Sequence, residues 1–313
     1  MRRIGKKLLS MILTLLVVSF LVFLAFSVIP GDPALHKLGT EATPEKVAAL
    51  REELGLNRPL LVRYGKFLAG AIRGDFGISY SYGMAVSSML AEKIPVTLTL
   101  SIMAFLMMVA VSVPLGIYTS RHQGGAADRI IYIFNQIIMA VPPFFAGIIL
   151  TLVFGLTLHL FTPGGYVSYK KSVPGFLGYL IFPAVAVALP KAAMAVKLLR
   201  SSLMEEMKKD YVRTAYSRGN RSKGVYYHHV LKNALIPVIT FWGMAFTDMM
   251  VGSIIVEQVF NIPGLGRVLL TAISNRDYPV VEGVILCLTL FIVGINTLVD
   301  IIYKKVDPRM DVE

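Results

Sequence analysis

The chain has 313 residues, of which 55% are hydrophobic and 16% are charged, and its net charge at pH 7 is +12. Soluble domains carry about 25% charged residues, so this composition excludes an ordinary soluble protein. In so apolar a chain, a positive excess is typical of Lys and Arg retained on the cytoplasmic side of a membrane rather than of nucleic-acid binding. Because Cys287 is the one cysteine, an internal disulfide is excluded as well.

Six apolar runs are each long enough to cross a bilayer, whose core of about 30 Å requires about 20 residues of helix. They are residues 8–29, 96–118, 130–160, 176–199, 234–262 and 278–303. The sequence therefore predicts an all-α polytopic membrane protein with six transmembrane helices. The third run is too long for a straight crossing and contains Pro142 and Pro143, so we expect a kink or a strong tilt there.

The first run follows Arg2, Arg3, Lys6 and Lys7, which is also how a signal peptide begins. The apolar part of a signal peptide has about 7–15 residues and ends at a cleavage site with small residues. This run is longer and ends Phe-Ser-Val-Ile-Pro-Gly, so we expect a retained helix.

The distribution of Lys and Arg predicts the orientation. If the N-terminus is inside, the segments on that side hold 18 basic residues, whereas the two short loops on the other side hold 4. Basic residues are retained on the cytoplasmic face. We therefore predict a multi-pass protein of the cell membrane with both termini in the cytoplasm.

The segment 30–93 lies outside in this topology and alternates turn signals with helical patterns. Thr43 and Pro44 are typical of a helix start, Gly55 of a helix end, and Pro59 of a second start. We expect a small folded insert that acts as a lid or a docking surface, with a loop of no role as the alternative. Residues 1–95 would hold the first helix and this insert, and residues 96–313 a five-helix core.

Motifs for catalysis are missing from the sequence. It has no Gly-rich phosphate loop, no His-Glu-x-x-His and no Gly-x-Ser-x-Gly. The sequential pair His228 and His229 would point about 100° apart on a helix, so the two imidazoles cannot share a metal ion. We expect no catalytic residue, no metal site and no cofactor in this chain.

Polar residues inside the apolar runs are candidates for a translocation path. Asp248 in the fifth run would attract cationic groups of a substrate; a protonated carboxyl and an ion pair with a partner subunit are the alternatives. Asn135 and Gln136 in the third run are expected to hydrogen-bond to neighbouring helices, and we include them on the candidate path. Lys191 is expected to extend its ammonium toward the interface.

The fifth run must end near Pro263, Gly264 and Gly266, because proline removes a donor and glycine permits sharp turns. The amphipathic stretch 267–273 would then lie at the outer interface. These three residues are candidates for an outer gate, with a plain helix-terminating turn as the alternative.

Residues 210–237 are strongly basic and lie between two apolar runs on the predicted cytoplasmic side. The fourth helix is expected to continue outward through 198–215, so that Ala215 and Gly219 share one helix face that a partner backbone can approach. Gly219 suits a left-handed helix end, and Ser222 would cap a second helix over 223–232. Contact of the basic side chains with anionic lipid is the alternative.

This segment resembles the EAA loop of bacterial ABC importer permeases, which reads Glu-Ala-Ala-x-x-x-Gly, nine residues, then Ile-x-Leu-Pro. Arg213-Thr214-Ala215 stands for Glu-Ala-Ala, and Lys232 stands at the proline. These departures resemble the B-type permease subunit of the oligopeptide, dipeptide and nickel importers. Further stretches that resemble this subunit follow one another along nearly the whole chain, at 30–33, 54–60, 74–79, 210–215, 232–237, 262–266, 275–279 and 307–309.

The resemblance implies a type I ABC importer permease fold and a pore shared with a homologous second permease subunit. It implies two cytoplasmic ATPase subunits that bind ATP and Mg, and an external substrate-binding protein that residues 30–93 help to receive. The coupling loop, residues 200–236, would transmit movement from the ATPases through a helix centred on residues 219–226. The implied coupling residues are Asp210, Arg213, Thr214, Ala215, Gly219, Asn220, Arg221, Ser222, Lys223, Gly224, Val225 and Tyr226.

The cargo implied by the resemblance is a di- or oligopeptide. Import of nickel or another metal chelate by the same architecture is the first alternative, because the subfamily includes both. An ion-coupled secondary transporter is the second alternative, although such folds usually have repeated halves, and no convincing repeat is present.

Overall fold

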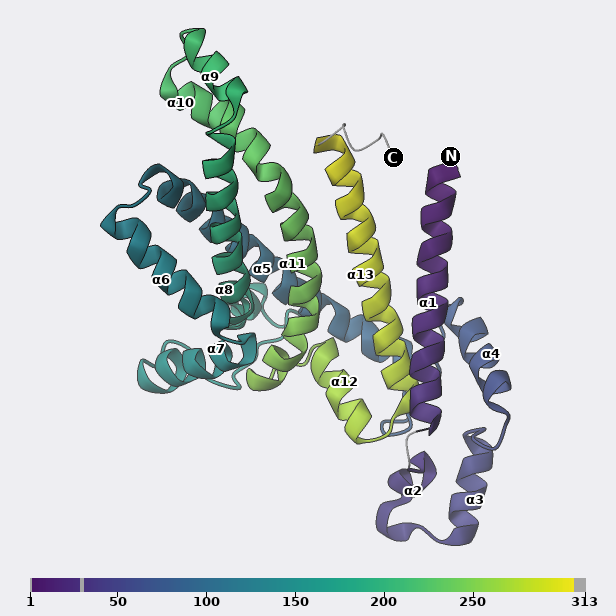
Figure 1. The fold of residues 1–313 in the computed structure, drawn as a ribbon. Coiled ribbons are helices and arrows are strands. Elements are labelled where there is room, and N and C mark those ends of the chain that lie inside the picture. The colour runs from purple at the N-terminus through teal and green to yellow at the C-terminus, as the bar shows by residue number, and fades with distance from the viewer. Residues whose placement is uncertain (1, 29–30, 307–313) are drawn as a thin grey trace. The chain divides into compact units, whose positions relative to one another are not determined.

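The computed structural model describes residues 2–28 and 31–306, which fold into helices joined by turns. Within this range the pairing of extended backbone is limited to an isolated bridge between Ile78 and Ala85. The predicted all-α class is confirmed (Figure 1). The chain divides into two compact units: an N-terminal unit of residues 1–97 and 263–294, and a core unit of residues 98–262 and 295–313.

Among the described residues, five helices are long and apolar enough to cross a membrane, and a bent pair of helices makes a sixth span if it is counted as one. The five are Leu9–Val28, Val86–Arg121, Val173–Glu206, Ser222–Val259 and Tyr278–Val299. The bent pair is Ala126–Ala140 with Pro143–Thr157, and its two parts meet at an angle of 105°. Two successive prolines with fixed φ and no donors, Pro142 and Pro143, account for a break much sharper than a kink.

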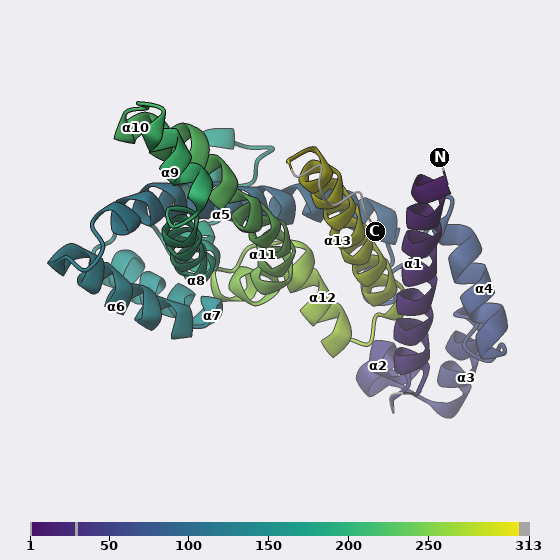
Figure 2. The same cartoon turned by 45° about the horizontal axis from the view of Figure 1, so that its top comes forward.

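The N-terminal unit contains α1 and the folded insert that the sequence predicts. Its elements are α1 (Arg2–Val28), α2 (Pro33–Leu38), the turn η1 (Gly39–Glu41), α3 (Pro44–Glu53), α4 (Leu60–Ala71), α12 (Leu265–Ser274) and the first parts of α5 (Val86–Arg121) and α13 (Tyr278–Val306). Thr43 caps α3 by accepting a hydrogen bond from the Lys46 amide, as predicted. Helices α1 and α4 run side by side (Figures 1 and 2), and Tyr64 of α4 hydrogen-bonds to Ser19 of α1 over 2.9 Å.

Two of the stretches that resemble the permease family meet in the N-terminal unit through Asp277. Its buried carboxylate accepts hydrogen bonds from the Ser79 hydroxyl and from the backbone amides of Tyr80 (2.9 Å) and Ser81 (3.1 Å). Arg276, the preceding residue, packs its guanidinium against Gly31, where a Cβ atom would clash with it. The Asp-Pro-Arg stretch at 307–309 and Pro30 lie outside the described residues.

The core unit is organised around α8. Its elements are the second part of α5, α6 (Ala126–Ala140), α7 (Pro143–Leu150), η2 (Thr151–Thr157), α8 (Val173–Glu206), α9 (Asp210–Ser217), α10 (Ser222–Gly224), η3 (Val225–Val230), α11 (Leu231–Val259) and the end of α13. Helix α8 packs against α6, α7 and α11 (Figure 1). Small buried residues allow this close approach of helix backbones; they are Ala184, Ala186, Ala188, Ala192, Ala193 and Ala195.

Replacement of Asp277 by Asn is expected to destabilise the N-terminal unit. An amide retains one acceptor oxygen but places a nitrogen against donors that the carboxylate now satisfies, which should cost about 3 kcal/mol. The midpoint of thermal unfolding in detergent should fall by about 5 °C or more. Asp75→Asn is the matched control, because its exposed carboxylate accepts one backbone hydrogen bond, from Gly77. Equal midpoints for the two variants would contradict the role given to Asp277.

Candidate functional site

The coupling loop begins where α8 ends at Glu206, and it is not a continuation of α8. Residues 207–209 form a turn, and α9 then starts at Asp210 as a separate helix. Glu206 stabilises the turn by accepting hydrogen bonds from the ammonium of Lys209 and from the phenol of Tyr211, the latter over 2.6 Å. Burial raises the pKa of the Tyr211 phenol, so the group stays protonated and donates. The predicted extension of the fourth helix through 198–215 is therefore wrong.

The helix expected to be centred on residues 219–226 is also replaced by a different arrangement. Gly219 has a φ of +79° and, with Arg218, forms a turn beyond the end of α9, as its left-handed preference predicts. Asn220 closes the turn by donating its amide to the carbonyl of Ala215 over 3.1 Å. The next helix starts at Ser222 with Arg221 as its N-cap residue, so the predicted capping by Ser222 is wrong. From Ser222 the helix runs without a break into α11 and ends at Val259.

A buried apolar cluster holds the coupling loop to the membrane helices. It joins the ends of α8, α9, η3 and α11, and Val113 and Ile117 of α5 pack against it. Its buried members are Leu199, Leu203, Val212, Ala215, Val225, Tyr226, Val230, Ala234 and Val238. The Tyr226 phenol also forms a hydrogen bond of 2.6 Å with the Ser120 hydroxyl of α5. The coupling loop thus shares one buried core with the three long helices α5, α8 and α11.

The twelve predicted coupling residues differ in their exposure. Three of them, Ala215, Val225 and Tyr226, are buried in the cluster, so Ala215 does not offer a surface to a partner in this structure. Gly224 is half-buried. The exposed members are Asp210, Arg213, Thr214, Gly219, Asn220, Arg221, Ser222 and Lys223. The exposed group and Arg218 lie at the tip of the core unit, beyond the ends of α8 and α11 (Figure 1), and present a basic surface.

Three cationic side chains of α8 are each matched by a polar group on a neighbouring helix. Lys191 pairs with Asp248 of α11 at 2.5 Å, and Lys197 donates to Gln136 of α6 over 3.3 Å. Arg200 makes two hydrogen bonds of 2.8 Å to Asp128 of α6. The paired geometry of Arg with a carboxylate is both directional and strong.

The pair of Lys191 and Asp248 changes the interpretation of Asp248. The sequence suggested snorkelling for Lys191, whereas the structure aims its ammonium at the carboxylate of α11. The Asp248 side chain is 59% exposed in the isolated chain, although it lies within a candidate span. Contact of such a charge with lipid is costly. Asn135 on α6 is half-buried and has no side-chain hydrogen bond within the described residues.

Pro263, Gly264 and Gly266 lie in the N-terminal unit, where the chain turns from α11 into α12. The amphipathic helix starts at Leu265, two residues before the predicted stretch, with Gly264 as its N-cap. The Leu265 amide donates to the Thr97 hydroxyl of α5 over 2.8 Å. Pro263 and Arg267 help to line a cavity of about 520 Å³ beside α5. The outer gate stays a prediction.

Three carboxylates with structural roles were missed in the sequence. Only the fold brings Asp128 to Arg200, which is far from it in the sequence. Asp277 lies within 275–279, one of the stretches that resemble the permease subunit, so the resemblance could have indicated a role for it. Glu282, near the start of the last apolar run, is 92% buried and lines a cavity. No three His, Cys, Asp or Glu side chains gather as a metal site in the part of the chain that the structure describes.

Comparison with family models matches almost the whole chain. Residues 112–312 match the model described as binding-protein-dependent transport system inner membrane component. Residues 1–101 match the model of the N-terminal part of such membrane components.

Curated relatives are similar over nearly their full length. A probable peptide ABC transporter permease protein of Sinorhizobium fredii is 36% identical over 305 residues, 97% of each chain. A putative peptide transport system permease protein of Brucella abortus is 37% identical with the same coverage. The glutathione transport system permease protein GsiC of Salmonella paratyphi A is 34% identical, again over 97% of both chains.

Among solved structures, the inward-facing MetNI methionine ABC transporter contains a similar chain. The TM-score is 0.55 at 14% identity, over 70% of this chain and 96% of that one. At this identity the likeness concerns the fold, and it agrees with the predicted type of permease fold.

Ala215→Leu tests whether Ala215 faces the core of the coupling loop. The larger side chain would overfill the buried cluster and cost about 1–3 kcal/mol. The purified chain, without any partner, should unfold at a lower temperature and be cut faster by trypsin after Arg213 and Arg218. Thr214→Leu, at the exposed neighbouring position, should change neither property. If Ala215→Leu behaved like Thr214→Leu in the isolated chain, Ala215 would belong to a partner-binding surface instead.

Proposed function

The chain belongs to the family of binding-protein-dependent transport system inner membrane components, and we propose that it forms half of the membrane pathway of an ATP-driven importer of short peptides. It is a permease subunit of the inner membrane and not an enzyme, since the ATPase of such importers is a separate subunit. Relatives named for peptides and for glutathione, itself a short peptide, support the choice of cargo over nickel or another metal chelate. The comparisons give the ion-coupled alternative no support.

The observation that carries the proposal is the exposed basic tip of the coupling loop on its buried cluster. A partner that binds the tip cannot displace it without moving α5, α8 and α11, because one core joins all four parts. Packed cores transmit such a displacement as a rigid-body movement. We place this tip in the cytoplasm, on the basis of the distribution of Lys and Arg, with both termini on the same side.

The family implies partners for this chain in general terms, and we propose their number and positions. An importer of this family works with an ATPase and a substrate-binding protein. We assign two ATPase subunits to the cytoplasmic side, each on one coupling loop, with ATP and Mg bound in those subunits. A homologous second permease completes the pore. ATP binding would draw the two coupling loops together and switch the pore between inward- and outward-facing states.

The translocation path is proposed to include the face of α8 and α11 that carries Lys191 and Asp248. The exposed carboxylate needs a polar environment, and either a water-filled path or the second permease provides one. This polar surface would extend along α6 to Gln136, which accepts a hydrogen bond from Lys197, and to the adjacent Asn135.

The outer end of the pathway is proposed to lie in the N-terminal unit. The insert 30–93 would receive the binding protein, and the turn at Pro263, Gly264 and Gly266 would serve as an outer gate. We also propose two domains: residues 1–95, which hold the first helix and the insert, and residues 96–313, which hold the five-helix core of the pore.

Gly219→Asp should weaken binding of the ATPase subunits by about tenfold or more, since it adds a negative charge to the basic tip. No atom lies within 4 Å of a Cβ atom at this position, and the φ of +79° is one that Asn and Asp tolerate better than other residues. The measurement is co-purification of the ATPases with the tagged permease, together with ATP-driven peptide uptake in proteoliposomes.

Gly219→Asn is the matched control, because it has the same shape and backbone demand without the charge. Binding and uptake by this variant should stay within about threefold of the wild type. Full ATP-driven uptake by Gly219→Asp would overturn the role proposed for the tip.

Asp248→Asn is expected to reduce peptide uptake at least tenfold, because it leaves the Lys191 ammonium unpaired among apolar helices. The double variant Lys191→Met with Asp248→Asn removes both charges and tests the role in transport. If the pair lines the path, the double variant should still transport poorly although its thermal stability recovers. Recovery of uptake together with stability would show that the pair only holds α8 to α11.

A further inference from the structure

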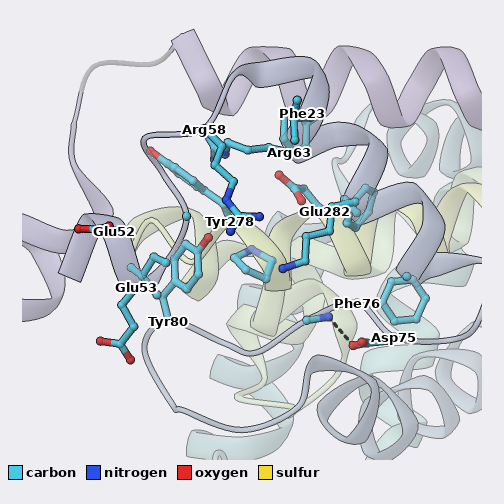
Figure 3. A pocket seen from close by; sticks show the side chains of 18 residues that line it. Phe23, Glu52, Glu53, Arg58, Arg63, Asp75, Phe76, Tyr80, Tyr278 and Glu282 are labelled. Atoms are coloured by element: carbon cyan, nitrogen blue, oxygen red, sulfur yellow. Dashed lines mark hydrogen bonds between the residues drawn. The ribbon is translucent and has the colours of Figure 1, made fainter. Parts of the chain in front are cut away.

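A second binding site is suggested by a cavity of about 500 Å³ in the N-terminal unit, a size typical of small-molecule sites. Its walls come from α1, the end of α3, α4, the turn around residues 75–80 and the first turns of α13 (Figure 3). The apolar part of the lining is mostly aromatic and includes Phe23, Phe76 and Tyr278. Most of the lining belongs to the insert 30–93, but no residue of the coupling loop, of the pair Lys191 and Asp248 or of the outer-gate turn takes part.

Glu282 of α13 is the buried acidic group of this cavity. Its side chain is 8% exposed, and Figure 3 shows its carboxylate directed into the group of lining side chains. Within the described residues it has neither a hydrogen bond nor a cation at ion-pair distance, although the charge of Arg63 acts on it. A buried carboxyl group without a direct partner can keep its negative charge only at a high cost in free energy, so the site is suited to a ligand that supplies a cationic donor.

Cationic groups lie in the same cavity. Arg58, Arg63 and Lys66 line it, and Arg58 and Lys66 have no side-chain partner in the described part of the chain. Arg63 lies over the Phe23 ring, with its guanidinium carbon 5.5 Å from the ring centre. The carboxylates of Glu52 and Glu53 point away from this group (Figure 3), so they do not neutralise it. The cavity therefore offers one buried carboxyl group, together with the exposed cations of Arg58 and Lys66 and the exposed carboxylate of Asp75.

Tyr80 adds a hydrogen-bond donor. Burial, and then the negative charge of Glu282, raise the pKa of its phenol to about 12, so the group stays protonated at neutral pH. Its backbone is held by Asp277, which also fixes the neighbouring turn. The wall of the cavity that carries Tyr80 is thus already ordered before any ligand arrives.

We propose that this cavity binds a small free zwitterion, an amino acid or dipeptide, with its ammonium group on Glu282 and its carboxylate on Arg58 and Lys66. A plain anion would leave the Glu282 carboxyl group without a partner, and a plain cation would leave Arg58 and Lys66 unpaired. A molecule with both charges satisfies both ends. The aromatic walls would cover a short apolar side chain between them.

This site rests on the proposed function. The distribution of Lys and Arg that places the coupling loop in the cytoplasm places this cavity on the outer side of the membrane, where an importer of peptides meets its cargo. The site would be an accessory peptide site formed by the permease itself. Binding is measured without transport, so failure of the site and failure of peptide import give separate results.

The test uses the purified permease complex in nanodiscs, without the external binding protein, and alanyl-alanine as the probe. Isothermal titration should detect binding to the wild type, and affinity should fall at least tenfold in Glu282→Gln and in Arg58→Gln. Glu45→Gln and Arg73→Gln are the matched controls, because both side chains are exposed and do not line the cavity. These controls should bind as the wild type does.

Blocked probes keep the test independent of the variants' folding. N-acetyl-alanyl-alanine lacks the ammonium group and alanyl-alaninamide lacks the carboxylate, so each should bind the wild type at least tenfold more weakly. Equal binding of a blocked probe, or of alanyl-alanine to Glu282→Gln, would overturn the proposal. So would native mass spectrometry that finds phosphatidylethanolamine bound to the wild type and lost in Glu282→Gln while the dipeptide does not bind, because the source of the zwitterion would then be a lipid.

Discussion

The need to match every charge in an apolar helix governs the core unit. Helix α8 carries Lys191, Lys197 and Arg200, and each of them reaches a polar group on α6 or α11. An unmatched ammonium or guanidinium at these positions would cost several kcal/mol, so the pairs restrict which faces of the three helices can meet. Alanine-rich packing brings the backbones close, and the charges select the rotation and register in which they do so.

The sequence predicted features that depend on neighbouring residues. The cap at Thr43, the break at Pro142 and Pro143 and the turn at Gly219 each follow from backbone chemistry within a few positions. Pairings between distant segments were not predictable in this way. Asp128 meets Arg200, and Asp277 meets the turn at 79–81, only because the helices between them pack in one arrangement.

The coupling loop shows how a correct family resemblance can accompany a wrong local structure. A small residue such as Ala215 suits a close approach from either side, and the spacing to Gly219 cannot tell a partner from the loop's own core. The structure places Ala215 inside, against the apolar cluster. The helix predicted over 223–232 is present, but its continuity with the fifth span was hidden for another reason: Pro237 stands at the junction, and proline is typical of a helix break.

That continuous helix has a mechanical consequence. Its 38 residues make a rod of about 57 Å, from the basic tip at Ser222 to Val259. Pro237 removes one backbone hydrogen bond within it, at a point closer to the tip than to the far end. If the rod pivots at this weakened turn, the arm beyond Pro237 is the longer of the two. A small sideways stroke at the tip would then be returned as a larger and opposite swing at the other end, so the helix would act as a lever that gains distance at the expense of force.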